Sequence, residues 1–157
     1  MRRVDETTLL FFDASCLIAA AASPAGGSGF LWSLCERGFF RAAVSQAVLA
    51  EAEANLFKKF DPVVLARHRM QLATCGPTMA PLPHHDESLL RFPDINPKDV
   101  HVVAAAQAID ADFILTLDQP LAIEIAAKAR SVAVRSPGAF IRHELPTHPS
   151  FPVLRND

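Results

Sequence analysis

The stretch TLLFFDAS, residues 8–15, decides how we interpret the rest of the chain. Residues 8–12 form a short, continuous, largely apolar run, which is typical of a strand covered by helices on both faces. Asp13 follows this run directly. A second segment has the same form, because the apolar residues 113–117 are followed by Asp118. Both segments predict strands of a parallel sheet, each followed at its carboxyl end by an aspartate.

Helical patterns fill most of the sequence around these two strands. Helices are expected at residues 14–22, 30–37, 46–59, 62–74, 97–110, 120–130 and 140–143. Further short strands are expected at residues 39–44 and 131–135. The glycine-rich residues 24–29 predict a flexible break, and the proline-rich residues 77–85 predict a loop. Strands that alternate with helices indicate an α/β fold, here a three-layer α/β/α sandwich around a parallel sheet.

Length and composition agree with one folded domain. The chain has 157 residues, of which 50% are hydrophobic and 20% are charged, so it carries enough apolar material for a full core. We expect one domain over residues 1–144 and a loosely held, proline-rich tail over residues 145–157. The net charge of −2 excludes a histone-like polybasic protein, although it leaves room for a local basic patch.

The cysteines and the apolar runs indicate a cytoplasmic protein. Three cysteines are present, an odd number, and no CxxC pair occurs, so we expect reduced thiols. No segment has the roughly 18 consecutive apolar residues of a membrane span, and no membrane partner is expected. The first strand is not followed by GxGxxG, and the chain contains no GxxxxGK[ST], so neither nucleotide-binding loop is expected.

Four carboxylates stand where a parallel sheet would place a ligand site. Asp13 and Asp118 follow two strands, and ligands of such sheets bind beyond the carboxyl ends of the strands. Asp99 lies in the first turn of its helix, and Glu51 lies in the second turn of another. Glu53 is a competing candidate, because the helical pattern does not decide which glutamate faces the sheet. Each aspartate, taken singly, would equally serve to cap or complement a helix start.

Several short segments together resemble the PIN domain family over roughly residues 7–142. They are FDAS (12–15), VS (44–45) with VLAE (48–51) and NL (55–56), PKD (97–99) with AAA (104–106), ADFILTLD (111–118) and SPGAF (136–140). The resemblance places the acidic positions of the family on Asp13, Glu51, Asp99 and Asp118. It places the hydroxyl positions near the site on Ser15 and Thr116. The subgroup resembled is that of VapC-like toxin components of bacterial toxin–antitoxin pairs.

The resemblance implies a Mg²⁺- or Mn²⁺-dependent endoribonuclease in a single PIN-like domain. It also implies an RNA substrate, a cognate antitoxin protein and a homodimer. Asp13, Asp99 and Asp118 would hold the metal directly, whereas Glu51 would hold it directly or through water. Ser15 and Thr116 would position water or phosphate.

The chemistry of the residues is consistent with that implication. Two carboxylates about 5 Å apart repel by about 3 kcal/mol at an effective dielectric constant of 20. Four carboxylates gathered in one pocket would therefore take up protons or recruit a cation. Oxygen ligands favour Mg²⁺ or Mn²⁺ over Zn²⁺. Such an ion orients a water molecule, lowers its pKa and neutralises charge on a phosphate.

Two other functions remain as alternatives. A haloacid-dehalogenase-like phosphatase also begins with an aspartate after its first strand, but that chemistry normally uses Asp-x-Asp, and here Ser15 replaces the second acid. A catalytically silent PIN fold would serve as an RNA-binding or protein-interaction module. Both alternatives make different predictions from a ribonuclease in a cleavage assay.

The remaining acids and histidines are interpreted as structural. Asp99 is preferred over Asp94 because it stands directly before the apolar helix, and Asp112 precedes its strand and so lies at the opposite end. Residues 84–86, His-His-Asp, are not expected to bind metal, and His101 is expected to be a packing or surface residue.

Two segments gather basic residues that are candidates for contact with RNA phosphates. They are Lys58, Lys59, Arg67 and Arg69 in one segment, and Lys128, Arg130, Arg135 and Arg142 in the other. Ordinary solvated helix faces are the alternative explanation. Contacts with phosphates would make RNA binding strongly dependent on salt.

Overall fold

The computed structural model describes residues 3–81, 85–129 and 131–154. Within these residues, five parallel strands form one sheet in the order β3-β2-β1-β4-β5. The strands are β1 (Leu9–Phe12), β2 (Arg41–Val44), β3 (Thr78–Met79), β4 (Phe113–Leu115) and β5 (Ala133–Arg135). Every residue of β1 and β4 is buried, as their continuous apolar sequences predict.

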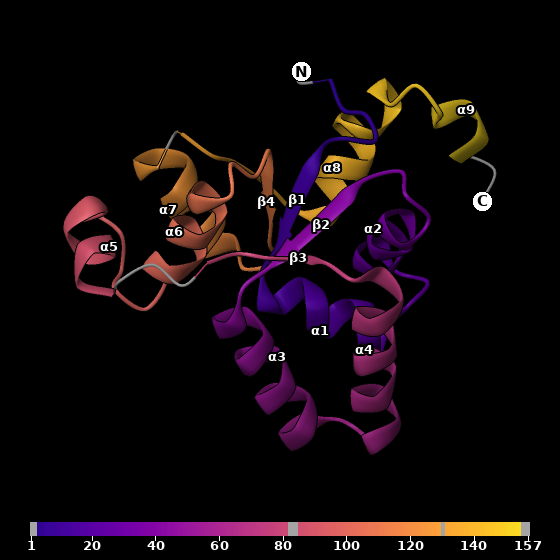
Figure 1. Cartoon of the computed structure of the whole chain (residues 1–157), viewed down its shortest axis with the longest axis horizontal. Coiled ribbons are helices and arrows are strands. Elements are labelled where there is room, and N and C mark those ends of the chain that lie inside the picture. Colours follow the sequence, from indigo (N-terminus) through magenta and orange to yellow (C-terminus); the bar gives the residue numbers. More distant parts are fainter. Residues whose placement is uncertain (1–2, 82–84, 130, 155–157) are drawn as a thin grey trace.

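Helices cover both faces of the sheet. They are α1 (Ala14–Ala22), α2 (Gly27–Glu36), α3 (Gln46–Lys59), α4 (Pro62–Cys75), α5 (His85–Arg91), α6 (Val100–Ala108), α7 (Gln119–Lys128), α8 (Pro137–His143) and α9 (Phe151–Leu154), with a 3₁₀ turn η1 (Leu145–Thr147). Figure 1 shows α5, α6 and α7 on one side of the strands and α2 and α8 on the other. The predicted α/β/α sandwich around a parallel sheet is confirmed.

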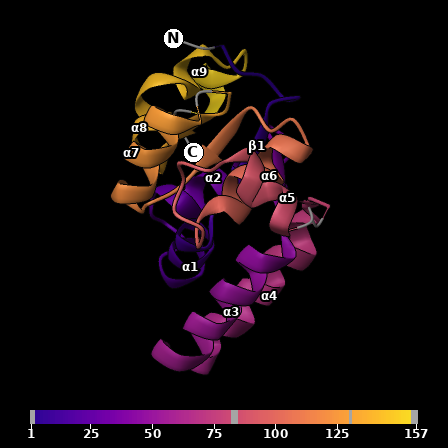
Figure 2. The same cartoon turned by 90° about the vertical axis from the view of Figure 1, so that its left-hand side faces the viewer.

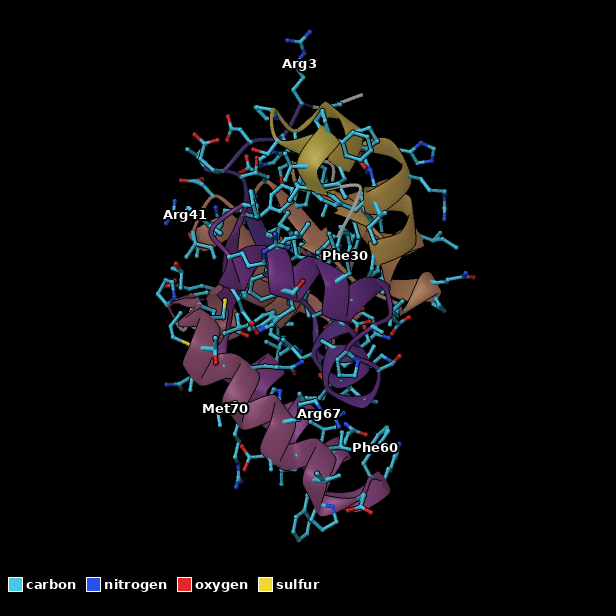
Figure 3. All side chains as sticks on the ribbon, turned by 90° about the vertical axis from the view of Figure 1, so that its right-hand side faces the viewer. Arg3, Phe30, Arg41, Phe60, Arg67 and Met70 are labelled. Atoms are coloured by element: carbon cyan, nitrogen blue, oxygen red, sulfur yellow. The ribbon has the colours of Figure 1, made fainter. Side chains whose placement is uncertain are left out.

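Helices α3 and α4 form an arm that extends away from the sheet (Figure 2). The side chain of Ser45 caps α3 by accepting a hydrogen bond from the Val48 N–H, as the sequence suggests. Phe60 lies at the tip of the arm, and Met70 lies further along α4 (Figure 3). The hydrophobic core lies around the sheet and not in the arm. There the rings of Phe12 and Trp32 pack edge to face, with their centroids 4.9 Å apart.

The predicted flexible break at residues 24–29 is wrong in its second half. Helix α2 begins at Gly27, three residues before the predicted start. Its residue Gly29 packs so closely that an added Cβ would stand 2.2 Å from the Pro24 carbonyl oxygen. Gly29 therefore serves the close approach of two backbone segments, not chain flexibility.

The predicted looseness of the tail is also wrong. Leu145, His148 and Leu154 are buried, and His148 Nε2 lies 2.8 Å from the Phe39 carbonyl oxygen. Pro146 lies in the first turn of η1, and Leu145, Phe151 and Leu154 pack against the core. The division into a single domain over residues 1–144 and a tail over residues 145–157 remains a prediction.

Three smaller differences concern short elements. The predicted loop at residues 77–85 contains the two-residue strand β3, and α5 begins at its end. Helix α6 begins at Val100, because Asn96 and Pro97 open a turn in which the Asp99 N–H donates to the Asn96 carbonyl oxygen.

Within the described ranges, no single helix is long and apolar enough to cross a membrane, and α1 and α2 reach that length only as a pair bent by 94°.

Candidate metal centre

The order of the strands creates a crevice at the carboxyl ends of β1 and β4. The connection that follows β1 runs to one face of the sheet, and the connection that follows β4 runs to the other (Figure 1). Ligands of open parallel sheets bind at such a point, where the direction of winding reverses. Asp13 follows β1, and its N–H donates to the Leu115 carbonyl oxygen of β4 at 3.0 Å. Asp118 follows β4 at the same edge.

One pocket of about 260 Å³ lies at this edge, and all four predicted acids line it. The acids come from four separate places in the chain, namely Asp13 after β1, Glu51 on α3, Asp99 before α6 and Asp118 after β4. Lys98 and His101 line the same pocket. The structure thus brings together every acid that the sequence and the resemblance select.

Asp13 is buried and is held by two hydroxyl groups. Its Oδ2 atom accepts hydrogen bonds from Thr116 Oγ1 at 2.7 Å and from Ser15 Oγ at 3.2 Å. Asp13 is 6% exposed and Thr116 is 1% exposed, so the bond between them is buried, whereas the bond from Ser15 is partly buried. The two hydroxyls fix the orientation of the carboxylate.

The same two hydroxyls also hold the backbone that leads to Asp118. The Leu117 N–H donates to Ser15 Oγ at 3.0 Å, and the Asp118 N–H donates to Thr116 Oγ1 at 3.1 Å. Ser15 and Thr116 therefore connect the two strand ends. Both lie beside the candidate centre, as predicted, with their oxygens engaged by the protein itself.

Helix capping accounts for only one of the three aspartates. Asp118 caps α7, since its Oδ1 atom accepts from the Leu121 N–H at 3.1 Å. Asp13 and Asp99 occupy the cap positions of α1 and α6, yet within the described chain neither side chain makes a capping hydrogen bond. Capping thus leaves the presence of Asp13 and Asp99 in the pocket unexplained.

The structure decides between the two glutamates of α3. Glu51 lines the pocket. Glu53 points to another partner and forms an ion pair with Arg69 of α4 at 2.6 Å. The contact depends on how α4 folds back along α3, which the helical pattern of α3 alone does not contain.

Burial of the pocket opposes the ionisation of Glu51 and Asp99. Burial raises the pKa of Glu51 above its ordinary value, and the nearby Asp13 carboxylate raises it further. Burial also raises the pKa of Asp99, although the Lys98 ammonium opposes this rise. A divalent cation would remove this penalty, because it favours the ionised form of each carboxylate.

The donor set fits a hard divalent cation in kind and in number, since four carboxylates supply up to eight oxygen atoms. The Nδ1 atom of His101 is buried and, in the described part of the molecule, has no hydrogen-bond partner. An orphaned nitrogen of this kind calls for an unseen partner. Within the same residues, no group of three or more His, Cys, Asp or Glu side chains is already arranged to hold a metal ion. The donors are gathered, but they do not form a closed ligand cage.

Two of the ionisable residues that line the pocket were not predicted to belong to it. His101 was expected to be a packing or surface residue, but it lines the pocket, and Lys98 does so as well. Their positions on either side of Asp99 were the available signal. Asp112 instead accepts a hydrogen bond from the Leu9 N–H at 2.8 Å, which agrees with its structural interpretation. The side chains of residues 84–86 lie outside the described residues.

Four of the predicted phosphate-binding side chains make contacts within the protein. Arg67 donates to the Ala21 carbonyl oxygen, Arg69 pairs with Glu53, Lys128 donates to the Asp94 carbonyl oxygen and Arg135 pairs with Glu144. Arg130 lies outside the described residues. Contact with RNA through these groups remains a prediction.

A doubly wound parallel sheet with an acidic pocket at its switch point defines a class of α/β proteins with a candidate metal centre. A family model described as a PIN domain matches residues 10–120. The chain belongs to the PIN domain family. A search of curated protein sequences gave no match.

Two solved structures share this fold. The crystal structure of PAE2754 from Pyrobaculum aerophilum is 20% identical, with 87% of this chain and 89% of that chain covered and a TM-score of 0.59. The crystal structure of VapBC2 from Rickettsia felis, bound to a DNA fragment from their promoter, is 14% identical. The match covers 82% of this chain and 98% of the chain in that structure, with a TM-score of 0.62.

Proposed function

We propose that this protein is a metal-dependent endoribonuclease that hydrolyses RNA phosphodiester bonds at a carboxylate-bound Mg²⁺ or Mn²⁺ centre. One observation carries the proposal. Four acids from four separate segments of the chain line a single pocket at the switch point of the sheet. Membership of the PIN domain family, whose members are generally nucleases, supports the same reaction.

The four acids would bind the cation in two ways. Asp13, Asp99 and Asp118 would bind it directly, and Glu51 would bind it directly or through water. When bound, the ion supplies an activated water molecule and neutralises charge that develops on the phosphate. An acidic pocket thereby accepts an anionic substrate.

Ser15 and Thr116 would act on this centre through Asp13. Their hydroxyls hold Asp13 Oδ2 in place, and they anchor the backbone at Leu117 and Asp118. Donation to a phosphate oxygen, part of the role predicted for them, would require the hydroxyl to give up its bond to Asp13 Oδ2. Lys98 would contact a phosphate oxygen at the rim, because it is the exposed cation of the pocket lining.

The biological setting belongs to the proposal as well. A VapC-like toxin in the cytoplasm, restrained by a cognate antitoxin, would explain why a compact nuclease of this kind exists. The structural likeness to the VapBC2 assembly supports this setting. A homodimer is also expected, and sedimentation velocity of the purified protein tests it directly.

A cleavage assay with two substrates tests the reaction. Purified protein is incubated with labelled RNA and with a phosphomonoester, in Mg²⁺ or Mn²⁺ and again with EDTA. RNA cleavage that EDTA and Asp13→Asn abolish, and that Asp94→Asn retains, is the expected result. Asp94 serves as the control because it is an exposed aspartate that does not line the pocket. Monoester hydrolysis alone would favour a phosphatase, and binding without cleavage would favour a silent module.

A further inference from the structure

A second hollow adjoins the candidate metal centre on the α2–α8 side. It measures about 250 Å³ and lies where the end of α1, the starts of α2 and α8, and the residue after Thr116 meet. Gly27, Leu117, Pro137 and Gly138 are among the residues that line it. We refer to it as the α2–α8 hollow.

The hollow and the acidic pocket are lined by consecutive residues of the chain, Leu117 and Asp118 respectively. The Leu117 N–H is bonded to Ser15 Oγ, which in turn donates to Asp13. One wall of the hollow is therefore fixed by the same hydrogen bonds that orient the candidate metal ligands.

The chemistry of the hollow differs from that of the acidic pocket. Among the described residues that line it, none is charged, and most of the lining is apolar. A phosphate would gain little there, whereas an uncharged flat group would bury apolar surface. The volume lies just below the range of about 300–1,000 Å³ that is typical for drug-sized ligands, so it suits a single ring system.

Neither close packing nor backbone conformation requires a glycine at position 27. A Cβ atom added to Gly27 would lie 3.5 Å from Ile141 Cδ1 and 3.6 Å from Pro137 Cβ, which are ordinary van der Waals distances. Gly27 does not have a left-handed backbone conformation, since the positive φ angles of described glycines occur at Gly38 and Gly76. Neither contact nor conformation therefore explains a glycine here, and its absent side chain leaves the hollow open.

We propose that the α2–α8 hollow binds one nucleobase of the RNA strand, that of the nucleotide next to the scissile phosphate. This inference rests on the proposed ribonuclease function, and it adds a base-recognition subsite to it. Single-stranded RNA is recognised by bases that leave the stack and enter protein pockets. The described residues that line the hollow include no aromatic ring, so the base is selected by its shape and by its edges.

Binding of short RNA tests the subsite without requiring catalysis. The probes are four trinucleotides that differ only in the middle base, together with a trinucleotide that lacks the middle base. Amide resonances of Gly27 and Gly138 are followed by two-dimensional NMR in the full-length protein. We expect them to shift with at least one base-containing probe and to stay unchanged with the abasic probe. Equal shifts with the abasic probe, or no shift with any probe, would overturn the proposal.

A pocket-filling variant provides the second test. Gly27→Val adds a whole isopropyl group toward the hollow, and Ala25→Val creates the same valine side chain at an exposed neighbour that does not line the hollow. Gly27→Val should weaken binding of the preferred trinucleotide about tenfold or more, to the level of the abasic probe, because small volume changes in a tight pocket have effects of this size. Ala25→Val should leave binding unchanged. Equal affinities of Gly27→Val and the unsubstituted protein would contradict the proposal.

The two tests separate this inference from the proposed function. Base-dependent shifts at Gly27 without RNA cleavage would retain the subsite and refute the ribonuclease. Cleavage that depends on Asp13, combined with the same base preference in Gly27→Val as in the unsubstituted protein, would retain the ribonuclease and refute the subsite.

Discussion

The acidic edge of the sheet and the α3–α4 arm show opposite uses of polar and apolar residues. At the edge, Asp13 and Thr116 are polar side chains buried in the interior. On the arm, Phe57, Val63 and Met70 are large apolar side chains with exposures of 77%, 58% and 67%. Buried polar groups are costly unless they are paired, and exposed apolar groups gain nothing from folding. Both regions thus depart from what stability alone would select.

Helix α3 belongs to both regions, since it contributes one residue to the acidic pocket and another to the exposed apolar surface of the arm. Its first half carries Glu51 into the pocket, while Val48, Ala52 and Leu56 are buried and anchor the helix. Its last turn carries Phe57 into solvent. One face and one end of this helix therefore serve separate tasks, so substitutions in the two regions should have separable effects.

The largest effect is expected from the pocket. Asp118→Asn should lower RNA cleavage at least about a thousandfold, because an amide is a weaker ligand than a carboxylate and removal of one member of a catalytic group has effects of this order. Thermal unfolding should change far less, since asparagine also accepts the capping bond of α7. Initial cleavage rates and melting curves of the same sample measure both. A variant that cleaves RNA normally would remove Asp118 from the site.

Thr116→Val should affect both activity and stability. It removes the hydroxyl that bonds to Asp13, so the buried carboxylate loses a partner, at a cost of about 1–3 kcal/mol in the free energy of unfolding. Cleavage should fall about 10–100-fold, as when a residue that orients a metal ligand is removed. Denaturant unfolding and cleavage rates measure the two effects.

Thr116→Ser is the matched control for that change. It retains the hydroxyl and should restore most of the activity while leaving a small packing defect. If both variants lost activity equally, the hydrogen bond to Asp13 would not be the reason for the loss.

Arm substitutions should leave the isolated protein almost unchanged. Phe57→Ser and Met70→Ser remove exposed apolar surface, so the free energy of unfolding should stay within about 0.5 kcal/mol, and cleavage should stay within about twofold. A strong loss of cleavage by Phe57→Ser would show that the arm and the pocket are coupled.

The smallest effect is the pH dependence of Glu51. Its pKa is raised in the folded protein, so without metal its ionised form opposes folding above that pKa, and the penalty vanishes as pH falls below the ordinary value of 4.5. Glu51→Gln should therefore raise Tm slightly at pH 7 in EDTA but not at acidic pH. Glu53→Gln, which is paired with Arg69 outside the pocket, should show no such gain. A gain that persists below pH 4 would contradict this assignment.

The sequence predicts the strand-end aspartates well because the rule behind them is local. An apolar run followed by an aspartate, as at Phe12 and Asp13, is visible without any tertiary contact. The choice of Glu51 over Glu53 is different, since it depends on the ion pair that Arg69 of α4 offers to Glu53. The pocket position of His101 likewise depends on how α6 packs beside β4.

Two segments predicted to be flexible or loose are in fact packed, because their contacts cannot be inferred from composition. Gly29 carries the composition of a flexible segment, and only its close approach to Pro24 reveals a packed helix start. The tail has the composition of a loose segment, yet burial of Leu145 and Leu154 fixes it. In both places, composition describes the local chain, whereas the contact partner lies elsewhere in the fold.

Calorimetric titration with Mn²⁺ measures whether the acids at the sheet edge form one cation site. The unsubstituted protein, Asp13→Asn, Asp118→Asn and the control Asp94→Asn are compared at the same pH and salt. We expect saturable binding by the unsubstituted protein and by Asp94→Asn, and its loss in both pocket variants. Equal binding by all four proteins, or no binding by the unsubstituted protein, would contradict the claim.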